Sequence, residues 1–169
     1  STMPGGMPDR TPPKSKAAST GFAALGLDDA IVASVTSLGY EEPTPVQRET
    51  IPLLLEGLDL LAQAATGTGK TAAFALPMLH RISNLISNLG ADDRRRTNGL
   101  VLVPTRELAM QVAEAVHKYA RGGRLSVLPL YGGAPMLQQV RGLERGANIV
   151  VATPGRALDH IRRGTLKLD

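Results

Sequence analysis

The chain has 169 residues and a mass of 17.8 kDa, which suits one domain of ordinary size and is too short for a two-domain enzyme. Hydrophobic residues make up 43% and charged residues 20%, as in soluble globular proteins, so the chain is expected to fold. Cysteine is absent, which excludes disulfides, thiolate zinc sites and thiol catalysis. Aromatic residues amount to 3%, too few for the rows of stacking rings found in many single-strand binders.

Neither a histidine-based metal centre nor a membrane span is indicated by the sequence. The three histidines, His80, His117 and His160, have no ligand-like spacing, and each is expected to be solvated on a helix. No apolar run approaches 18 residues, and residues 1–20 contain no secretory segment. These features predict a soluble, cytoplasmic protein that contacts no membrane.

The net charge of +4 is unevenly distributed along the chain. Residues 121–169 contain 8 basic and 3 acidic residues, a balance of +5, whereas residues 21–91 contain 3 and 7, a balance of −4. A basic carboxyl-terminal third favours a polyanionic partner. An ordinary solvated basic surface explains the same charge equally well, so charge alone does not decide between them.

The chain divides into a tail and one domain. Residues 1–20 contain four prolines among small polar residues and cannot bury enough apolar surface to become ordered, so they are expected to form a flexible tail. Residues 21–169 form the domain. Its first helix is predicted from apolar residues at helical spacing and should end at Gly39, and a second should begin at Pro45 with Thr44 as its cap.

Four short apolar runs predict the strands of a mostly parallel sheet. Each run is followed by turn residues and then by a helix-like stretch, which gives a βαβαβαβα order with helices on both faces of the sheet. The runs are Leu58 to Ala62, Leu100 to Val103, Leu125 to Leu130 and Ile149 to Ala152. Ligands of such α/β sheets bind beyond the carboxyl ends of the strands.

A phosphate-binding loop follows the first of these runs, and a helix to about Leu89 follows the loop. Its glycines let backbone N–H groups face one concavity, the helix amino terminus adds positive charge, and Lys70 can reach the outer phosphates. The Thr71 hydroxyl is placed to bind Mg²⁺. The loop consists of Ala64, Ala65, Thr66, Gly67, Thr68, Gly69, Lys70 and Thr71, and the ligand it predicts is a nucleoside triphosphate or diphosphate. A glycine-rich turn that merely caps a helix is the alternative.

Five ordered segments resemble the motifs of the DEAD-box ATP-dependent RNA helicases. They are Gly39 to Gln47 with Phe22 upstream, Ala64 to Thr71, Pro104 to Ala109, Gly132-Gly133, and Thr153 to Arg156. The resemblance covers residues 22–169 and implies most of the first RecA-like domain of such a helicase, incomplete at its carboxyl end. It implies ATP or ADP with Mg²⁺ as ligands, and a second RecA-like domain in the full-length protein.

The resemblance implies roles for individual residues. Gln47 would recognise adenine, Tyr40 would stack on the base, and Phe22 would support the same pocket, while Lys70 and Thr71 would act in catalysis. A carboxamide can pair with the N7 and N6 positions of adenine. The alternative is that Thr44 and Gln47 form a capping box at the start of their helix.

The later motifs resemble the family's contacts to the RNA backbone. Such contacts would bind single-stranded or duplex RNA without sequence preference, because phosphates and sugars carry no base code. The residues concerned are Pro104, Thr105, Arg106, Gly132, Gly133, Thr153, Pro154, Gly155 and Arg156. Thr105 and Thr153 can cap helices, Pro154 suits a first helical position, and the two arginines supply charge. Each segment alone would pass for a plain turn between a strand and a helix.

Motifs that phosphoryl transfer requires are missing from the sequence. The family's Asp-Glu-Ala-Asp and Ser-Ala-Thr motifs do not occur in it, and the arginine finger belongs to the second domain. We therefore expect this piece of a helicase to bind nucleotide and to hydrolyse little or none. A short, non-catalytic nucleotide-binding or RNA-binding module is the alternative, and a DNA translocase is a weaker rival.

Overall fold

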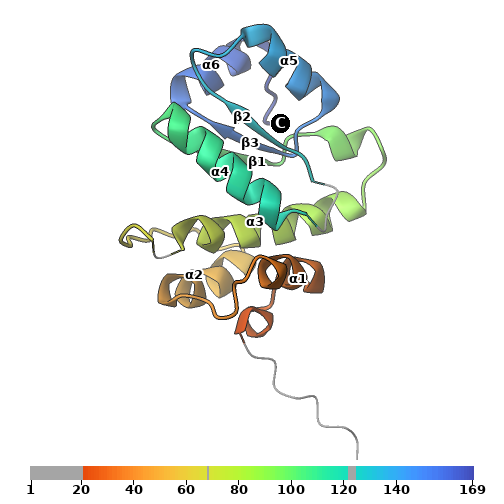
Figure 1. Ribbon diagram of the computed structural model, residues 1–169. Coiled ribbons are helices and arrows are strands. Elements are labelled where there is room, and N and C mark those ends of the chain that lie inside the picture. The colour runs from red at the N-terminus through yellow and green to blue at the C-terminus, as the bar shows by residue number, and fades with distance from the viewer. Residues whose placement is uncertain (1–20, 68, 122–124) are drawn as a thin grey trace, which may run out of the picture.

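The computed structural model describes residues 21–67, 69–121 and 125–169. The predicted tail, residues 1–20, lies outside them. In Figure 1, α1 and α2 lie beneath α3, and the sheet with α4, α5 and α6 lies above α3. The elements in chain order are η1 (Gly21–Leu25), α1 (Asp29–Ser37), α2 (Pro45–Leu55), α3 (Lys70–Ser87), η2 (Asp93–Arg95), β1 (Gly99–Leu102), α4 (Arg106–Tyr119), β2 (Val127–Leu130), α5 (Met136–Arg145), β3 (Ile149–Ala152) and α6 (Pro154–Arg163).

The sheet is parallel, with the strand order β1-β3-β2. Ile149 of the central strand lies opposite Gly99 on one side and Val127 on the other, and Ala152 lies opposite Leu102 and Leu130. All three strands are therefore in register, and their carboxyl ends finish at one edge. Each strand is followed by a helix, which confirms the predicted α/β class.

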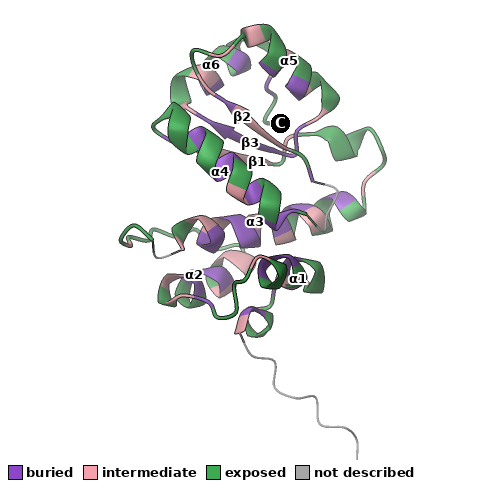
Figure 2. Cartoon of the chain, in the orientation of Figure 1, coloured by how far each residue is buried: buried purple, intermediate pink, exposed green. Residues whose placement is uncertain are grey.

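Two apolar clusters cover the opposite faces of the sheet. Figure 2 colours the chain by burial, and β3, the strand between the clusters, is buried along its whole length. Ile149 and Val151 of β3 belong to the larger cluster, which also contains residues of α1 to α4. Val150 and Ala152 belong to the smaller cluster, which includes Ala157 of α6. Alternate side chains of a strand point to opposite faces, so the predicted cover of helices on both faces is confirmed.

One predicted strand is wrong. Residues 58–62 have no regular secondary structure, and Leu61 is 99% exposed. A strand is stable only when a neighbouring strand satisfies its N–H and C=O groups. Among the described residues, the sheet consists of β1, β3 and β2, and residues 58–62 pair with none of these strands.

The predicted helix ends are confirmed by their local geometry. Thr44 caps α2, and the first helix ends before Gly39, whose φ of +90° is in the left-handed region. Pro45 occupies the first turn of α2, where its missing N–H costs no hydrogen bond. None of the helices in the described ranges is long and apolar enough to cross a membrane.

Candidate functional site

The phosphate loop leads directly into α3. Gly67 and Gly69 both have φ of +82°, and Gly69 occupies the capping position of the helix. Lys70 is exposed at the first helical position, and Thr71 behind it is half-buried. The amino-terminal end of α3, with the positive end of its helix dipole, therefore begins at an exposed lysine, an arrangement suited to a phosphate chain. Thr68, also predicted for this site, lies outside the described residues.

Gln47 joins the start of α2 to this loop. Its Oε1 accepts a hydrogen bond from the Thr44 N–H at 3.0 Å, and its own N–H donates to Thr44 Oγ1 at 3.4 Å, which completes the capping box. Its Nε2 donates to the Gly69 carbonyl at 3.1 Å. The side chain is 2% exposed. The capping alternative is thus observed, and Gln47 also fixes the residue that caps α3.

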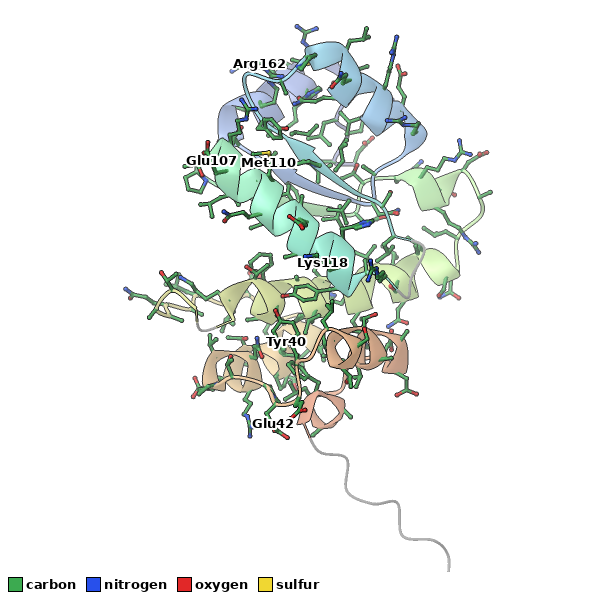
Figure 3. The ribbon with its side chains drawn as sticks, in the orientation of Figure 1. Tyr40, Glu42, Glu107, Met110, Lys118 and Arg162 are labelled. Carbon is green, nitrogen blue, oxygen red and sulfur yellow. The ribbon has the colours of Figure 1, made fainter. Side chains whose placement is uncertain are left out.

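The two aromatic residues predicted for a base pocket have other partners. Phe22 is buried in the larger core cluster. Tyr40 is 45% exposed, and its ring meets that of Tyr119 edge to face with 6.2 Å between centroids. Burial, with the neighbouring Tyr40 hydroxyl, raises the pKa of Tyr119 to about 12. Figure 3 shows Tyr40 beside the end of α4 that carries Lys118, with Glu107 at the other end of that helix.

A cavity of about 440 Å³ adjoins the loop, and Lys70, Thr71 and Ala64 are among its lining residues. Most of the remaining lining is apolar and comes from α2, α3 and residues 60–62. Mg²⁺ takes about six oxygen ligands, and Thr71 supplies one hydroxyl. Within the described ranges, no cluster of three His, Asp or Glu side chains is arranged to hold a metal. The described residues therefore supply too few ligands to hold Mg²⁺ unless oxygen atoms of bound phosphates complete its coordination.

The residues predicted to contact RNA lie at the carboxyl ends of the three strands. Pro104 to Arg106 follow β1, Gly132 and Gly133 follow β2, and Thr153 to Arg156 follow β3. Backbone hydrogen bonds join neighbouring ends: the Val103 N–H donates to the Ala152 carbonyl at 2.9 Å, and the Thr153 N–H donates to the Leu130 carbonyl at 3.0 Å. The structure thus brings the three segments to one edge.

The helix starts at this edge differ in how they are capped. Thr105 caps α4, where its hydroxyl accepts a hydrogen bond from the Leu108 N–H at 3.2 Å. Thr153 occupies the same position on α6, but within the described part of the chain its side chain makes no capping bond. Pro154 is in the first turn of α6, as predicted. Pro154 and Gly155 are exposed, so the first turn of α6 is open to an anion.

The two arginines of the edge have different surroundings. Arg106 is exposed, and its guanidinium lies 5.1 Å from the centre of the Tyr131 ring, a cation–π contact that leaves its N–H groups available. Arg156 has a side chain that is only 14% exposed. Its Nη1 donates to the Ala134 carbonyl at 3.1 Å and to Gln139 Oε1 at 3.2 Å, and its Nε lies 3.8 Å from Asp159. Arg106 is therefore the better placed of the two to meet a phosphate.

Three residues of this region were missed by sequence reasoning or assigned wrongly. His160 was predicted to be solvated and is fully buried, while Gln139 is buried and Tyr131 half-buried under Arg106. A signal for His160 was present, because it follows the buried Ala157 by three residues on α6 and so shares its face. The Gln139 and Tyr131 contacts join separate elements and have no local signature.

Comparison with known proteins identifies relatives of this chain. A family model described as DEAD/DEAH box helicase matches residues 44–168. The ATP-dependent RNA helicase CshA of Listeria monocytogenes is 52% identical over 150 residues, and the DEAD-box ATP-dependent RNA helicase CshA of Bacillus cereus is 48% identical over 149. The matches cover 89% and 88% of this chain but only 27% of each relative, so the chain spans about a quarter of their length.

Two solved structures share the fold. A hypothetical ATP-dependent RNA helicase from Sulfolobus tokodaii matches 83% of this chain and 38% of its own, with a TM-score of 0.72 and 37% identity. The RNA helicase Prp28 from Chaetomium thermophilum, bound to ADP, matches 87% of this chain and 35% of its own, with a TM-score of 0.76 and 39% identity. The fold is RecA-like, and this chain belongs to the DEAD/DEAH box helicase family.

Proposed function

We propose that this chain is the nucleotide-binding part of an ATP-dependent RNA helicase that unwinds or remodels RNA duplexes. It binds ATP or ADP through residues 64–71 and the backbone of RNA through the ends of β1, β2 and β3. One observation carries the proposal: the starts of α3 and α4 lie on the same side of the molecule in Figure 1, so the phosphate loop and the first segment proposed to bind RNA open toward that side. A relative with a related fold was solved with ADP bound.

Nucleotide binding is assigned to the loop because its groups match a phosphate chain. The open first turn of α3 supplies N–H donors, Lys70 supplies a cation, and Thr71 supplies a hydroxyl for Mg²⁺ that arrives with the nucleotide. Gln47 of α2 contacts the loop through its hydrogen bond to the Gly69 carbonyl. We propose that it also recognises adenine. Its Oε1 has a second lone pair and its Nε2 a second proton, although the side chain must become more accessible to offer them to a base.

Hydrolysis is not proposed for these 169 residues alone. Phosphoryl transfer needs metal-bound carboxylates, an oriented water and charge stabilisation together. The sequence contains no Asp-Glu-Ala-Asp motif, and within the described ranges no acidic cluster replaces it. We therefore propose that this chain binds nucleotide without turning it over, and that a second RecA-like domain completes the enzyme.

The test measures binding and turnover in the same preparation. Calorimetric titration with Mg²⁺-ADP should show saturable binding, and ATPase assays with single-stranded RNA should show no stimulation. Saturable binding without turnover also fits a non-catalytic module. RNA-stimulated ATPase activity of a longer protein that continues this sequence would distinguish a helicase from such a module. Robust ATP turnover by this chain would contradict the proposed division of labour, and absence of any ADP binding would overturn the assignment of residues 64–71.

A further inference from the structure

A cluster of buried polar side chains holds the turn after β2 on both sides of its two glycines. Gln139 of α5 donates from Nε2 to the Tyr131 carbonyl at 2.9 Å. Arg156 of α6 donates from Nη1 to the Ala134 carbonyl at 3.1 Å. Tyr131 and Ala134 directly flank Gly132-Gly133, so two side chains from two helices hold both ends of this turn.

The cluster continues into the interior through His160. Gln139 Oε1 lies 3.2 Å from Arg156 Nη1 and 2.8 Å from His160 Nε2. On the other side of the imidazole, Nδ1 lies 2.8 Å from the Thr165 hydroxyl. His160 is fully buried and Gln139 nearly so. A single Gln139 oxygen thus connects α6 to α5 beneath the turn.

The donors and acceptors in this cluster follow from groups that have only one role. A guanidinium can only donate and a backbone carbonyl can only accept, so the Gln139 oxygen must face Arg156 and its nitrogen must face Tyr131. That oxygen also faces His160, so Nε2 of the imidazole carries the proton and donates it. The Thr165 hydroxyl lies 2.8 Å from Nδ1 and 3.1 Å from the His160 carbonyl, so its single proton is shared between these two acceptors when His160 is neutral. Every polar atom of the Gln139 and His160 side chains has a partner when His160 is neutral.

We propose that Gln139, Arg156 and His160 are positioning residues that hold the Gly132-Gly133 turn against the start of α6 and so set the spacing between two of the phosphate contacts. The proposal rests on the proposed RNA function. Both glycines are exposed, and Gly133 has φ of +82°. Two successive glycines would otherwise be free to adopt many conformations, and fixing them in advance lowers the entropy lost when RNA binds.

The charge state of His160 fits this role. Burial lowers the pKa of His160, and Arg156 and Arg163 lower it further, while Asp159 opposes them. These charged groups lie on α6, and from α5 and the residues after α6 the imidazole faces the neutral Gln139 and Thr165. The imidazole is therefore neutral at pH 7 and can accept from Thr165 while it donates to Gln139.

Two adjacent glutamines of α5 provide a matched pair for the test. Gln139 is buried in the cluster, whereas Gln138 is exposed. Gln139→Leu removes the three hydrogen bonds that this side chain makes to Tyr131, Arg156 and His160. Gln138→Leu makes the same chemical change outside the cluster. We expect Gln139→Leu to bind single-stranded oligo-U about tenfold more weakly, the effect of one buried hydrogen bond. Its salt dependence and its affinity for ADP should stay unchanged, because no phosphate contact is removed and the nucleotide loop is elsewhere.

Readouts that do not require RNA separate this proposal from the RNA function itself. Amide exchange at Gly132 and Gly133 should be faster in Gln139→Leu than in Gln138→Leu. Gln139→Glu keeps an acceptor for His160 and adds an anion beside it, so the His160 pKa measured by NMR should rise. If the parent chain binds no RNA, the RNA function fails, while these two measurements still test whether the cluster holds the turn.

Specific outcomes would overturn the proposal. Equal amide exchange in the two leucine variants would show that the cluster does not hold the turn. Altered exchange with equal RNA affinity, in a parent chain that binds RNA, would show that the turn's position does not matter for RNA. If Gln139→Leu fails to fold, amide exchange and RNA affinity are measured in Gln139→Glu instead, with Gln138→Glu as its control. Exchange should again be faster, and RNA binding weaker, in the variant at position 139.

Discussion

The side-chain amide of Gln47 donates a 3.1 Å hydrogen bond to the carbonyl of Gly69, the residue that caps α3. This bond connects two segments that are 22 residues apart in the sequence. Its acceptor belongs to the phosphate loop and its donor to the capping box of α2. The phosphate loop is therefore supported from a neighbouring helix as well as by its own glycines.

The first prediction compares two glycines of the loop. Gly67 and Gly69 share φ of +82°, so alanine at either position should cost about 1–2 kcal/mol of stability for the left-handed backbone. A methyl group at Gly69 would also collide with Gln47 Nε2, whereas at Gly67 it would meet open space among the described residues. Gly69→Ala should therefore lose roughly a further 1–3 kcal/mol in urea unfolding. Equal losses would show that the contact with Gln47 is unimportant.

The second prediction concerns the choice of nucleotide. If Gln47 reads the base, ADP should bind more tightly than GDP, and Gln47→Ala should remove about 1–3 kcal/mol of that difference. Gln47→Glu is the control, since a carboxylate can still accept from the Thr44 N–H and keep the capping box. It should lose the discrimination while keeping most of the helix cap. Equal affinities of the parent chain for ADP and GDP would leave Gln47 with its capping and loop contacts only.

The third prediction separates nucleotide binding from folding. Lys70 is exposed, so Lys70→Ala should change the free energy of unfolding by no more than about 0.5 kcal/mol. It should nevertheless abolish the part of nucleotide affinity that depends on the phosphates, because the cation of the loop is lost. Lys118→Ala is a control of equal charge change on α4, where Lys118 pairs with Glu114. Calorimetry with ADP and adenosine measures the phosphate-dependent part, and unchanged ADP affinity in Lys70→Ala would refute the assignment.

Sequence reasoning succeeded where the signal is local. The start of α2 was predicted from Thr44 as cap and Pro45 at the first helical position, and the capping box of Thr44 and Gln47, given as the alternative role of Gln47, also lies within four residues. The central strand, Ile149–Ala152, was predicted with its observed bounds because a fully buried strand is apolar at every position. The three RNA segments were placed at one edge because parallel strands end together.

The same reasoning failed where the outcome depends on distant partners. Residues 58–62 have an apolar pattern typical of a buried strand, but pairing requires a neighbour that the pattern cannot supply. His160 was predicted to be solvated, and its burial depends on Gln139, 21 residues away. Arg156 was predicted as a phosphate contact, and its engagement with Ala134 and Gln139 became visible only in the structure.

A fourth prediction tests the segment before the phosphate loop. Backbone amides of residues 58–62 should exchange rapidly with solvent, because they lie outside regular secondary structure. Amides of β3 should be strongly protected, since it is paired on both sides. Hydrogen exchange followed by NMR measures both, and protection of residues 58–62 similar to that of β3 would restore the predicted fourth strand.

The last prediction concerns the salt dependence of RNA binding. Contacts to phosphates carry no sequence code, so poly-U and mixed-sequence oligonucleotides should bind with similar affinity. The logarithm of the affinity should fall with log salt by about 0.7 per phosphate neutralised on a single strand. Arg106→Ala should reduce that slope, because its guanidinium is exposed at the edge. Arg121→Ala removes an equal charge beyond the far end of α4 and should leave the slope unchanged.

Arg156→Ala should weaken binding with a smaller change of slope, because its Nη1 is already bonded within the protein. Fluorescence anisotropy across a salt series measures each slope. A slope that falls more in Arg156→Ala than in Arg106→Ala would show that the Arg156 side chain leaves the cluster to bind phosphate.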